Sequence, residues 1–393
     1  METKAVVLGT NYFIGLTIIR TLGYEGVKTI AVDYLDEDLY ASKSKYLNAH
    51  IMAPSFRDDP DGYINKLIEI ASKEETKPLL FPSADPYAGF IDDHLEILRE
   101  HFLIPMSEKG LWTRVMKKES LFHLAIEHGM PVPETIETPD PNLAERVESE
   151  LGYPCIVKPV DSPAFVAKFR RKVLYCNNRE ELLDAVGRAD EEGLKVIVQR
   201  IIPGFDDHMY TFDFHVDQRG KVSHWATCRK LRQFPINFGA SVYTEQRYVP
   251  ELAELGIPFL EKIGYRGFGE IEFKKDEKTG KFYMIEINTR TTTLNYLLYK
   301  AGINFPYVCY RDMTGDPLPD KAVKEDTGYV FQYLFEDIFA CRDYMRKGQL
   351  TAGEIMRSLF RKKAPAIWSL DDPMPALSYT GTILGKTVKR LFR

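Results

Sequence analysis

Two short segments in the C-terminal half, EIEF at 270–273 and EINTR at 286–290, constrain this chain most strongly. Each alternates polar and apolar residues, which predicts a strand with one buried face. The polar run between them ends in glycine, as hairpin connections often do. Paired as a hairpin, the strands would present Glu272, Glu286 and Asn288 on one face, and such oxygen ligands suit Mg²⁺. The alternative is an ordinary hairpin with solvated carboxylates.

Length and charge limit the class of protein. With 393 residues the chain exceeds one compact core, so we expect two or three domains. Its composition, 44% hydrophobic and 12% aromatic, is that of a globular protein. A net charge of -5 gives no general attraction for nucleic acid, and we expect no nucleic-acid partner.

The cysteine pattern favours a reducing compartment. The five cysteines are scattered without a CxxC pair, which argues against a zinc site and a disulfide framework. The N-terminus lacks a secretory leader, and no apolar run approaches the roughly 20 residues that span a bilayer. We therefore expect a cytoplasmic protein.

Residues 1–107 are predicted to form a small α/β domain. The segment 4–33 follows a strand, helix, strand order, so its sheet is expected to be parallel. A further strand at 78–82 is followed closely by Asp85. Ligands of parallel sheets lie beyond the carboxyl ends of the strands. Asp85 is therefore a candidate substrate-binding residue, with a plain turn as the alternative.

A compact α+β unit is predicted at about 130–200. Lys158 ends an apolar strand, where a lysine either points outward or reaches a buried anion. Gln199 lies at the end of another strand and is followed by a Pro-Gly turn. Such a turn can expose backbone polar groups to the edge of a heterocycle. Asp206 comes soon after, within reach of ribose hydroxyls.

Five segments taken in order resemble the ATP-grasp superfamily. They are Lys118 before a helix, the strand IVKP, the segment QRIIPG, the strand IEF and the strand EINTR. The resemblance covers about 118–304. It implies that the parallel α/β domain at 1–107 is the usual N-terminal companion of a two-subdomain ATP-grasp domain at 108–310, with its lid at about 130–200. From about 311 the sequence pattern itself predicts a helical C-terminal segment, 311–393.

The resemblance also implies roles in ATP binding. The phosphates would be held by Lys118 and Lys158. The adenine edge would contact Gln199 and the backbone of Arg200 and Ile202. The ribose would be bound by Asp206, with Asp207 as its rival.

Metal and catalytic roles follow from the same resemblance. Mg²⁺, with Mn²⁺ as the alternative ion, would be bound by Glu272, Glu286 and Asn288. Arg290 would face the transferred phosphoryl group and would act in catalysis together with Lys158.

The segment after Lys158 departs from the superfamily pattern. That segment is usually a glycine-rich loop that closes over the phosphates through backbone N–H groups. Residues 161–171 contain no glycine, although they carry Lys168, Arg170 and Arg171. These cations either replace some of the missing donors or belong to a basic surface loop.

The activity that the resemblance implies is an ATP-dependent carboxylate–amine ligase, which forms an amide or peptide bond through an acyl phosphate. Arg229 and Arg232 lie in a basic run followed by proline and glycine. This run resembles carboxylate–amine ligases, D-aspartate ligases among them, and the two arginines are expected to bind substrate. The partners would be a small-molecule carboxylate and an amine acceptor, such as a cell-wall precursor. The alternatives are a carboxylase, a small-molecule kinase and a catalytically idle nucleotide-binding scaffold.

The tail suggests a further contact. Residues 383–393 place apolar side chains on one half of a helix and Lys386, Lys389, Arg390 and Arg393 opposite them. Such a helix can lie on an anionic membrane, here the inner face. Docking onto the protein body or onto a partner is the alternative. Members of the superfamily are often dimers, so a homodimer is also expected.

Overall fold

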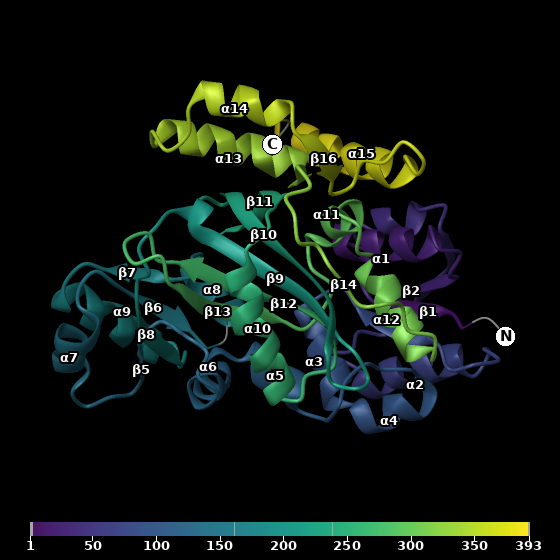
Figure 1. Cartoon of the computed structure of the whole chain (residues 1–393), viewed down its shortest axis with the longest axis horizontal. Coiled ribbons are helices and arrows are strands. Elements are labelled where there is room, and N and C mark those ends of the chain that lie inside the picture. Colours follow the sequence, from purple (N-terminus) through teal and green to yellow (C-terminus); the bar gives the residue numbers. More distant parts are fainter. Residues whose placement is uncertain (1–2, 161, 238, 392–393) are drawn as a thin grey trace.

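The computed structural model describes residues 3–160, 162–237 and 239–391 and contains three β-sheets (Figure 1). A four-stranded sheet forms the N-terminal part, an eight-stranded sheet forms the centre, and a second four-stranded sheet lies at the far side from the N-terminus. This mixed architecture, with a parallel N-terminal sheet and large antiparallel sheets, confirms the predicted fold class.

The N-terminal sheet has the order β3-β2-β1-β4, and all of its strands are parallel. Every residue of β1, β2 and β4 is buried, as in other parallel sheets, and β1 and β4 are continuous apolar runs. The elements are β1 (Ala5–Leu8), α1 (Phe13–Gly23), β2 (Thr29–Asp33), η1 (Tyr40–Lys43), β3 (Leu47–Met52), α2 (Pro60–Ala71), β4 (Leu79–Pro82), α3 (Asp85–Asp93), α4 (Leu95–His101) and α5 (Leu111–Met116).

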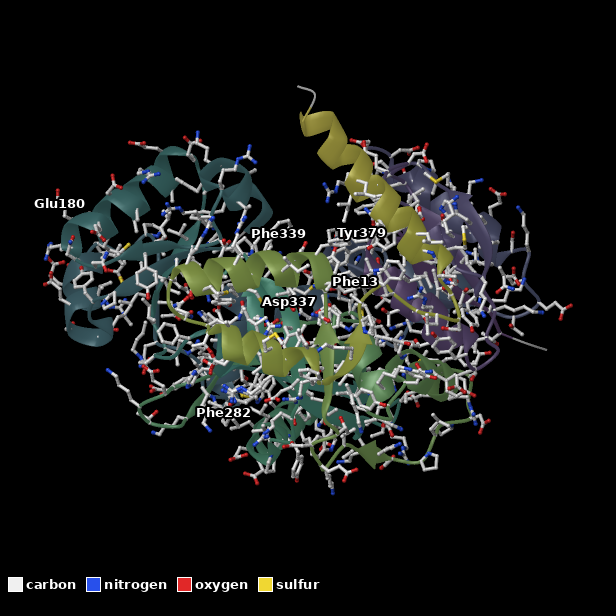
Figure 2. The ribbon with its side chains drawn as sticks, turned by 90° about the horizontal axis from the view of Figure 1, so that it is seen from above. Phe13, Glu180, Phe282, Asp337, Phe339 and Tyr379 are labelled. Carbon is white, nitrogen blue, oxygen red and sulfur yellow. The ribbon has the colours of Figure 1, made fainter. Side chains whose placement is uncertain are left out.

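The small sheet has the order β5-β8-β6-β7, is antiparallel, and packs around its own apolar core. Its position, beside α9 at one side of the molecule, is marked by Glu180 in Figure 2. The elements here are α6 (Lys118–Glu127), β5 (Thr135–Glu137), α7 (Leu143–Arg146), η2 (Val147–Leu151), β6 (Cys155–Pro159), α8 (Ser162–Phe169), β7 (Leu174–Cys176), α9 (Arg179–Glu191) and β8 (Val196–Arg200).

The central sheet has the order β13-β12-β9-β10-β11-β15-β16, with β14 paired to β10. Its predicted hairpin is present as β12 and β13. The elements of this region are η3 (Asp206–His208), β9 (Met209–Val216), β10 (Val222–Phe234), β11 (Ala240–Gln246), α10 (Pro250–Lys262), β12 (Gly267–Lys275), β13 (Phe282–Asn288), α11 (Asn295–Lys300) and α12 (Phe305–Met313).

The C-terminal segment is not helical throughout, in contrast to the expectation for residues 311–393. It adds β14 (Lys321–Ala322), β15 (Tyr329–Gln332) and β16 (Lys362–Pro365) to the central sheet. Strands of two to four residues are too short to show a period of two in the sequence, so the pattern could not reveal them. Helices α13 (Leu334–Arg346), α14 (Ala352–Leu359) and α15 (Met374–Leu391) form an outer layer at one edge of the molecule, with α13 beside β10 and β11 of this sheet and α15 beside η1 of the N-terminal domain (Figure 1). We call residues 334–385 the C-terminal layer.

Aromatic and ionic contacts join the N-terminal sheet to the rest. The rings of Phe81 in β4 and Phe268 in β12 stack with centroids 5.7 Å apart, and Phe13 in α1 lies 4.8 Å from the ring of Tyr333. Arg20 forms a buried ion pair with Asp372 at 2.8 Å. These contacts hold segments that are far apart in sequence in one body.

The predicted tail helix falls at the edge of the described structure. Residues 383–391 belong to α15, but residues 392–393 and the side chains of residues 386–391 lie outside the described part of the chain. Within that part, none of the helices has both the length and the apolar character needed to cross a membrane.

Candidate nucleotide and metal site

A large cavity lies between the three sheets. Its volume is about 1480 Å³, more than the roughly 300–1,000 Å³ of a usual small-molecule pocket. It therefore has room for a nucleotide and further substrates. Most of the predicted site residues line it, and these are Asp85, Lys118, Lys158, Gln199, Arg200, Ile202, Asp206, Glu272, Glu286, Asn288 and Arg290.

The hairpin places its polar side chains on the cavity side. Glu272 of β12 is the direct cross-strand partner of Glu286 of β13, and Glu270 is the partner of Asn288. Because side chains of a strand alternate between two faces, the residues at i and i+2 share a face. All four side chains line the cavity. Their juxtaposition depends on the pairing register that the sequence predicts for a hairpin.

Lysines surround these carboxylates. Lys158 on β6 is buried, and its Nζ donates a hydrogen bond to Oε1 of Gln199 at 3.0 Å. Burial, reinforced by repulsion from Lys118, lowers the pKa of Lys158 to about 8. A bound phosphate would stabilise the charged form of Lys158, because it would offset both the desolvation of the ammonium group and its repulsion from Lys118.

The same lysines keep the carboxyl group of Glu286 ionised. Burial raises the pKa of its carboxyl, but attraction from Lys118, Lys230 and Lys158 outweighs burial and holds the pKa below its usual value. Glu286 is therefore a carboxylate at neutral pH. It can serve as a cation ligand without first losing a proton.

Lys230 of β10 pairs with the second carboxylate. Its Nζ lies 2.6 Å from Oε2 of Glu272, and only 5% of the lysine is exposed. The ammonium group of Lys230 thus pairs with Glu272, so this face of the hairpin accommodates a positive charge. Sequence analysis did not select Lys230, although it stands between Arg229 and Arg232.

Arg290 links the hairpin to the N-terminal domain. Its Nε donates to Oδ1 of Asp85 at 2.7 Å and its Nη2 to Oδ2 of the same carboxylate at 3.3 Å. Nη2 also donates to Oδ1 of Asn288 at 3.3 Å, whose Nδ2 donates to Glu270 at 2.9 Å. Two residues that the sequence selected separately, Asp85 and Arg290, therefore form one ion pair at the edge of the cavity.

The predicted adenine and ribose residues also line the cavity. Gln199 is nearly fully buried, and its Nε2 donates to Oγ1 of Thr135 at 2.9 Å. Oδ2 of Asp206 accepts hydrogen bonds from the backbone N–H of Asn237 at 2.8 Å and from the hydroxyl of Tyr344. Asp207 is not among the lining residues, because its carboxylate pairs with Arg229 at 2.9 Å.

The glycine-free segment after Lys158 is a helix. Residues 162–169 form α8, and Lys168 extends to Glu192 at 2.6 Å. Asp161 lies outside the described residues. The lysine of this region that lines the cavity is Lys172. Neither Lys168, Arg170 nor Arg171 does so.

The structure places Arg229 and Arg232 away from the cavity lining. Arg229 pairs with Asp207, and Arg232 makes two hydrogen bonds to the buried Asp337 of α13, at 2.6 and 2.8 Å. The pairing of β10 with β11 shifts register on both sides of Arg232. A bulge of this kind re-aims side chains, so Lys230 and Gln233 line the cavity instead.

The donor set suits a hard divalent cation. Among the described residues there is no cluster of three or more His, Cys, Asp or Glu side chains arranged to bind a metal. Mg²⁺ usually binds through one or two carboxylates and completes its shell with water and substrate phosphates. The Glu272 and Glu286 pair, with the amide oxygen of Asn288 nearby, fits that description.

Comparison with known proteins agrees with this geometry. Residues 127–308 match the family model described as D-ala D-ala ligase C-terminus. D-aspartate ligase of Enterococcus faecium is 29% identical over 318 residues, which covers 77% of this chain and 74% of that protein. Over most of its length the chain is thus similar to carboxylate–amine ligases of the ATP-grasp type. A D-alanine–D-alanine ligase of Bacillus velezensis is 32% identical over 150 residues, or 34% of this chain and 39% of that protein.

A solved structure shares the fold. The biotin carboxylase domain of 2-oxoglutarate carboxylase from Hydrogenobacter thermophilus, a dimer crystallised with MgADP and bicarbonate, has a TM-score of 0.64 and 19% identity. The match covers 84% of this chain and 74% of that one. The predicted resemblance to ATP-grasp ligases of the carboxylate–amine type is confirmed.

Sequence reasoning missed several residues of the cavity. Glu270 could have been found, since strand alternation puts it on the face of Glu272. Tyr344 could not, because it contacts Asp206 from a helix 138 residues further along the chain. Nor could Lys172, because the pattern of residues 161–172 does not show which of its cations faces inward.

Proposed function

We propose that this protein is an ADP-forming carboxylate–amine ligase that activates a small carboxylic acid as an acyl phosphate and transfers it to an amine. One observation carries the proposal. Glu272 and Glu286 form a cross-strand pair inside a cavity of about 1480 Å³, amid buried lysines. Carboxylates and lysines together suit a triphosphate and its metal ion better than either would alone.

In the first step a carboxylate oxygen of the acid attacks the γ-phosphorus of ATP, and ADP leaves. Lys118 and Lys158 neutralise phosphate oxygens, and Arg290 stabilises the charge that develops on the transferred group. Mg²⁺, or Mn²⁺ in its place, would be held by Glu272, Glu286 and Asn288 and would supply charge neutralisation between the phosphates. The Asp85 contact fixes the guanidinium of Arg290 in one orientation.

In the second step the amine nitrogen attacks the acyl carbon and inorganic phosphate leaves, with loss of one proton from nitrogen. Phosphate is a good leaving group, whereas oxide from a free carboxylate is not. The products are an amide or peptide, ADP and phosphate. Binding in the cavity would limit the access of water to the mixed anhydride, which would otherwise hydrolyse.

The nucleotide base would lie at the Gln199 end of the cavity. Gln199 and the backbone of Arg200 and Ile202 would meet the adenine edge, because these residues border the same part of the cavity. Asp206 would accept from ribose hydroxyls through Oδ1, since Oδ2 is already bonded to Tyr344 and Asn237. Arg229 and Arg232 would not contact the substrate, because both are paired with carboxylates away from the cavity.

A cell-wall precursor as the amine acceptor remains part of the proposal, on the strength of the likeness to D-aspartate ligase and D-alanine–D-alanine ligase. The test is phosphate release from purified protein with ATP, Mg²⁺ or Mn²⁺, and a matrix of acids against amines. Release that requires both an acid and an amine supports a ligase. Release with an acid alone indicates a kinase or hydrolase, and release that depends on bicarbonate indicates a carboxylase.

The expected homodimer and the contact of residues 383–393 with an anionic membrane are proposals as well. Sedimentation velocity tests the first, since a monomer at micromolar concentration would contradict it. For the second, a chain ending at residue 382 is compared with the full chain for binding to anionic vesicles. Equal binding would show that the tail does not contribute.

A further inference from the structure

The C-terminal layer exposes an unusual share of the apolar surface. Of the twenty large apolar side chains that are exposed in the described part of the chain, twelve lie between residues 334 and 384. Single exposed apolar residues are ordinary, but a concentration of them marks a surface that binds something. Figure 1 shows that α13, α14 and α15 lie together at one edge of the molecule.

Helix α14 shows the feature most clearly. It is strongly amphipathic, yet none of its residues is buried. Leu359 is 56% exposed and Phe360, just after the helix, is 84% exposed. Hydrogen bonds between Thr351 and Glu354 cap its first turn. A helix of eight residues gains little stability alone in water, so its uncovered apolar side indicates a partner outside this chain.

Helix α13 turns a similar face outward. Its buried side carries Asp337, Ala340 and Tyr344, which pack toward the central sheet. At 100° per residue, the opposite side carries Ile338, Phe339 and Met345 with Arg342 and Arg346 between them, and all five are exposed. In Figure 2, Phe339 and Asp337 lie on opposite sides of α13. The outward face therefore combines apolar side chains with arginines.

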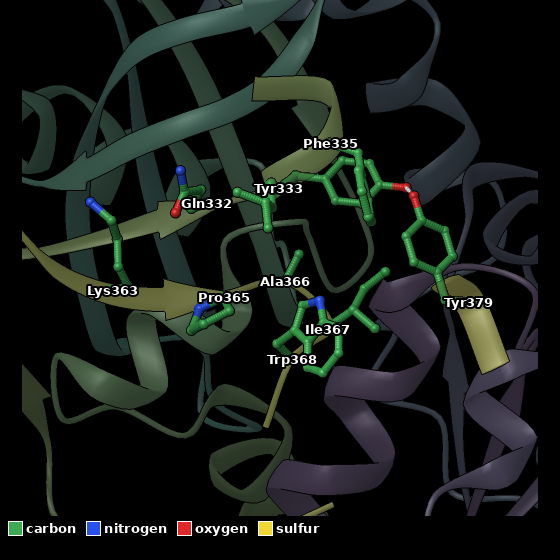
Figure 3. A pocket seen from close by; sticks show the side chains of 10 residues that line it. Gln332, Tyr333, Phe335, Lys363, Pro365, Ala366, Ile367, Trp368 and Tyr379 are labelled. Atoms are coloured by element: carbon green, nitrogen blue, oxygen red, sulfur yellow. Dashed lines mark hydrogen bonds between the residues drawn. The ribbon is translucent and has the colours of Figure 1, made fainter. Parts of the chain in front are cut away.

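An apolar groove continues this surface. It has a volume of about 160 Å³ and lies where the start of α13, the end of β16 and α15 meet. Figure 3 shows Phe335, Ile367, Trp368 and Tyr379 around it. Tryptophan and tyrosine favour the boundary between water and lipid, because each ring joins a large apolar body to one polar group.

The charge of this region is opposite to that of the rest of the chain. The layer, residues 334–385, contains seven lysines and arginines against six aspartates and glutamates, and residues 386–393 add four more cations, although the whole chain has a net charge of -5. Two of those six carboxylates, Asp337 and Asp372, are buried against Arg232 and Arg20. Cations therefore predominate on the surface of the layer.

We propose that the C-terminal layer docks the protein peripherally on an anionic phospholipid bilayer. Exposed apolar side chains would enter the headgroup region while the surrounding arginines and lysines bind lipid phosphates. A second copy of the chain fits less well, because a two-fold contact through this face would set its cations against one another. The inference does not depend on the ligase reaction, since the layer lies outside the cavity.

The apolar part is tested with a matched pair of variants. Leu359→Ser and Leu183→Ser remove leucines of similar exposure, 56% and 49%, from α14 and from α9 on the small sheet. Cosedimentation of the full chain with vesicles of phosphatidylglycerol and phosphatidylcholine is measured at low salt. We expect the wild type and Leu183→Ser to bind equally and Leu359→Ser to bind roughly tenfold more weakly. Equal binding by all three proteins would overturn the proposal.

The electrostatic part needs a second pair. Arg346→Glu with Lys347→Glu reverses two exposed charges of the layer, and Arg188→Glu with Lys195→Glu makes the same change in net charge on the small-sheet side. The first pair is expected to weaken vesicle binding more than tenfold and the second to change it less than twofold. Binding to phosphatidylcholine alone as strong as to the anionic vesicles would contradict the proposal, as would a wild type that stays in the supernatant. If sedimentation velocity shows a dimer that Leu359→Ser dissociates, the face joins two copies and the membrane assignment fails.

Discussion

The hydroxyl of Tyr344 donates a hydrogen bond to Oδ2 of Asp206, and it accepts one from the backbone N–H of Gln233 at 3.1 Å. Asp206 lines the cavity, whereas Tyr344 belongs to α13 in the C-terminal layer. The buried ion pair of Arg232 with Asp337 fixes α13 against β10. A helix beyond the family-matched residues 127–308 thus orients the carboxylate that we assign to the ribose.

Tyr344→Phe is expected to raise the KM for ATP about three- to tenfold and to leave kcat within about twofold. The substitution removes one hydrogen bond to a charged group but keeps the ring. Tyr379→Phe is the control, since the hydroxyl of Tyr379 meets that of Tyr333 outside the cavity. Steady-state kinetics with varied ATP decides. An unchanged KM in Tyr344→Phe would show that Asp206 does not need this contact.

Arg290→Ala is expected to lower kcat by about 10² to 10³, because it removes a preorganised charge from the transferred phosphoryl group. Asp85→Asn should lower kcat by about tenfold, since the guanidinium remains but loses its ionic partner. As the control, Asp184→Asn breaks the exposed pair with Arg188 on α9 and should have no effect. Equal losses in Arg290→Ala and Asp85→Asn would instead give Asp85 a direct part in substrate binding.

Glu286→Ala is expected to lower the rate of ADP formation by at least about 10²-fold while the protein stays folded. Its carboxylate balances several lysines in the cavity and is assigned to the metal ion. Glu277→Gln serves as a comparison, because Glu277 also lines the cavity but lies on its exposed side. ADP release and circular dichroism are measured together. Undiminished turnover in Glu286→Ala would remove the metal assignment.

The pH dependence of ATP binding should report Lys158. Its pKa is lowered to about 8, mainly by burial and then by Lys118. Below pH 8 the free protein carries the ammonium that attracts phosphate, and above pH 8 it loses that charge. Bound phosphates favour the charged form, so kcat/KM for ATP should fall as pH rises through about 8 while kcat changes less.

Lys158→Arg separates this lysine from other titrating groups, because a guanidinium stays charged over the whole range. Its kcat/KM profile should be flat between about pH 7 and 9, even if its absolute value is lower. A decline near pH 8 that persists in Lys158→Arg would assign the proton to another group.

Local patterns sufficed for much of the fold. Apolar runs such as β1 and β4 identified the buried strands of a parallel sheet, and the alternation in β12 and β13 identified the hairpin. The short strands β15 and β16 gave no such pattern. They join the central sheet because β15 pairs with the edge of β11 and β16 then pairs with β15.

By itself, the sequence determined the hairpin and the order of the segments that carry Lys158, Gln199, Glu272 and Glu286, because these depend on spacing within or between neighbouring strands. Tertiary structure alone decided that Asp85 meets Arg290 and that Tyr344 meets Asp206. It also decided, through a bulge in β10, that Lys230 and not Arg232 faces the cavity. Contacts between distant segments depend on how whole sheets pack, and a local pattern carries no information about that packing.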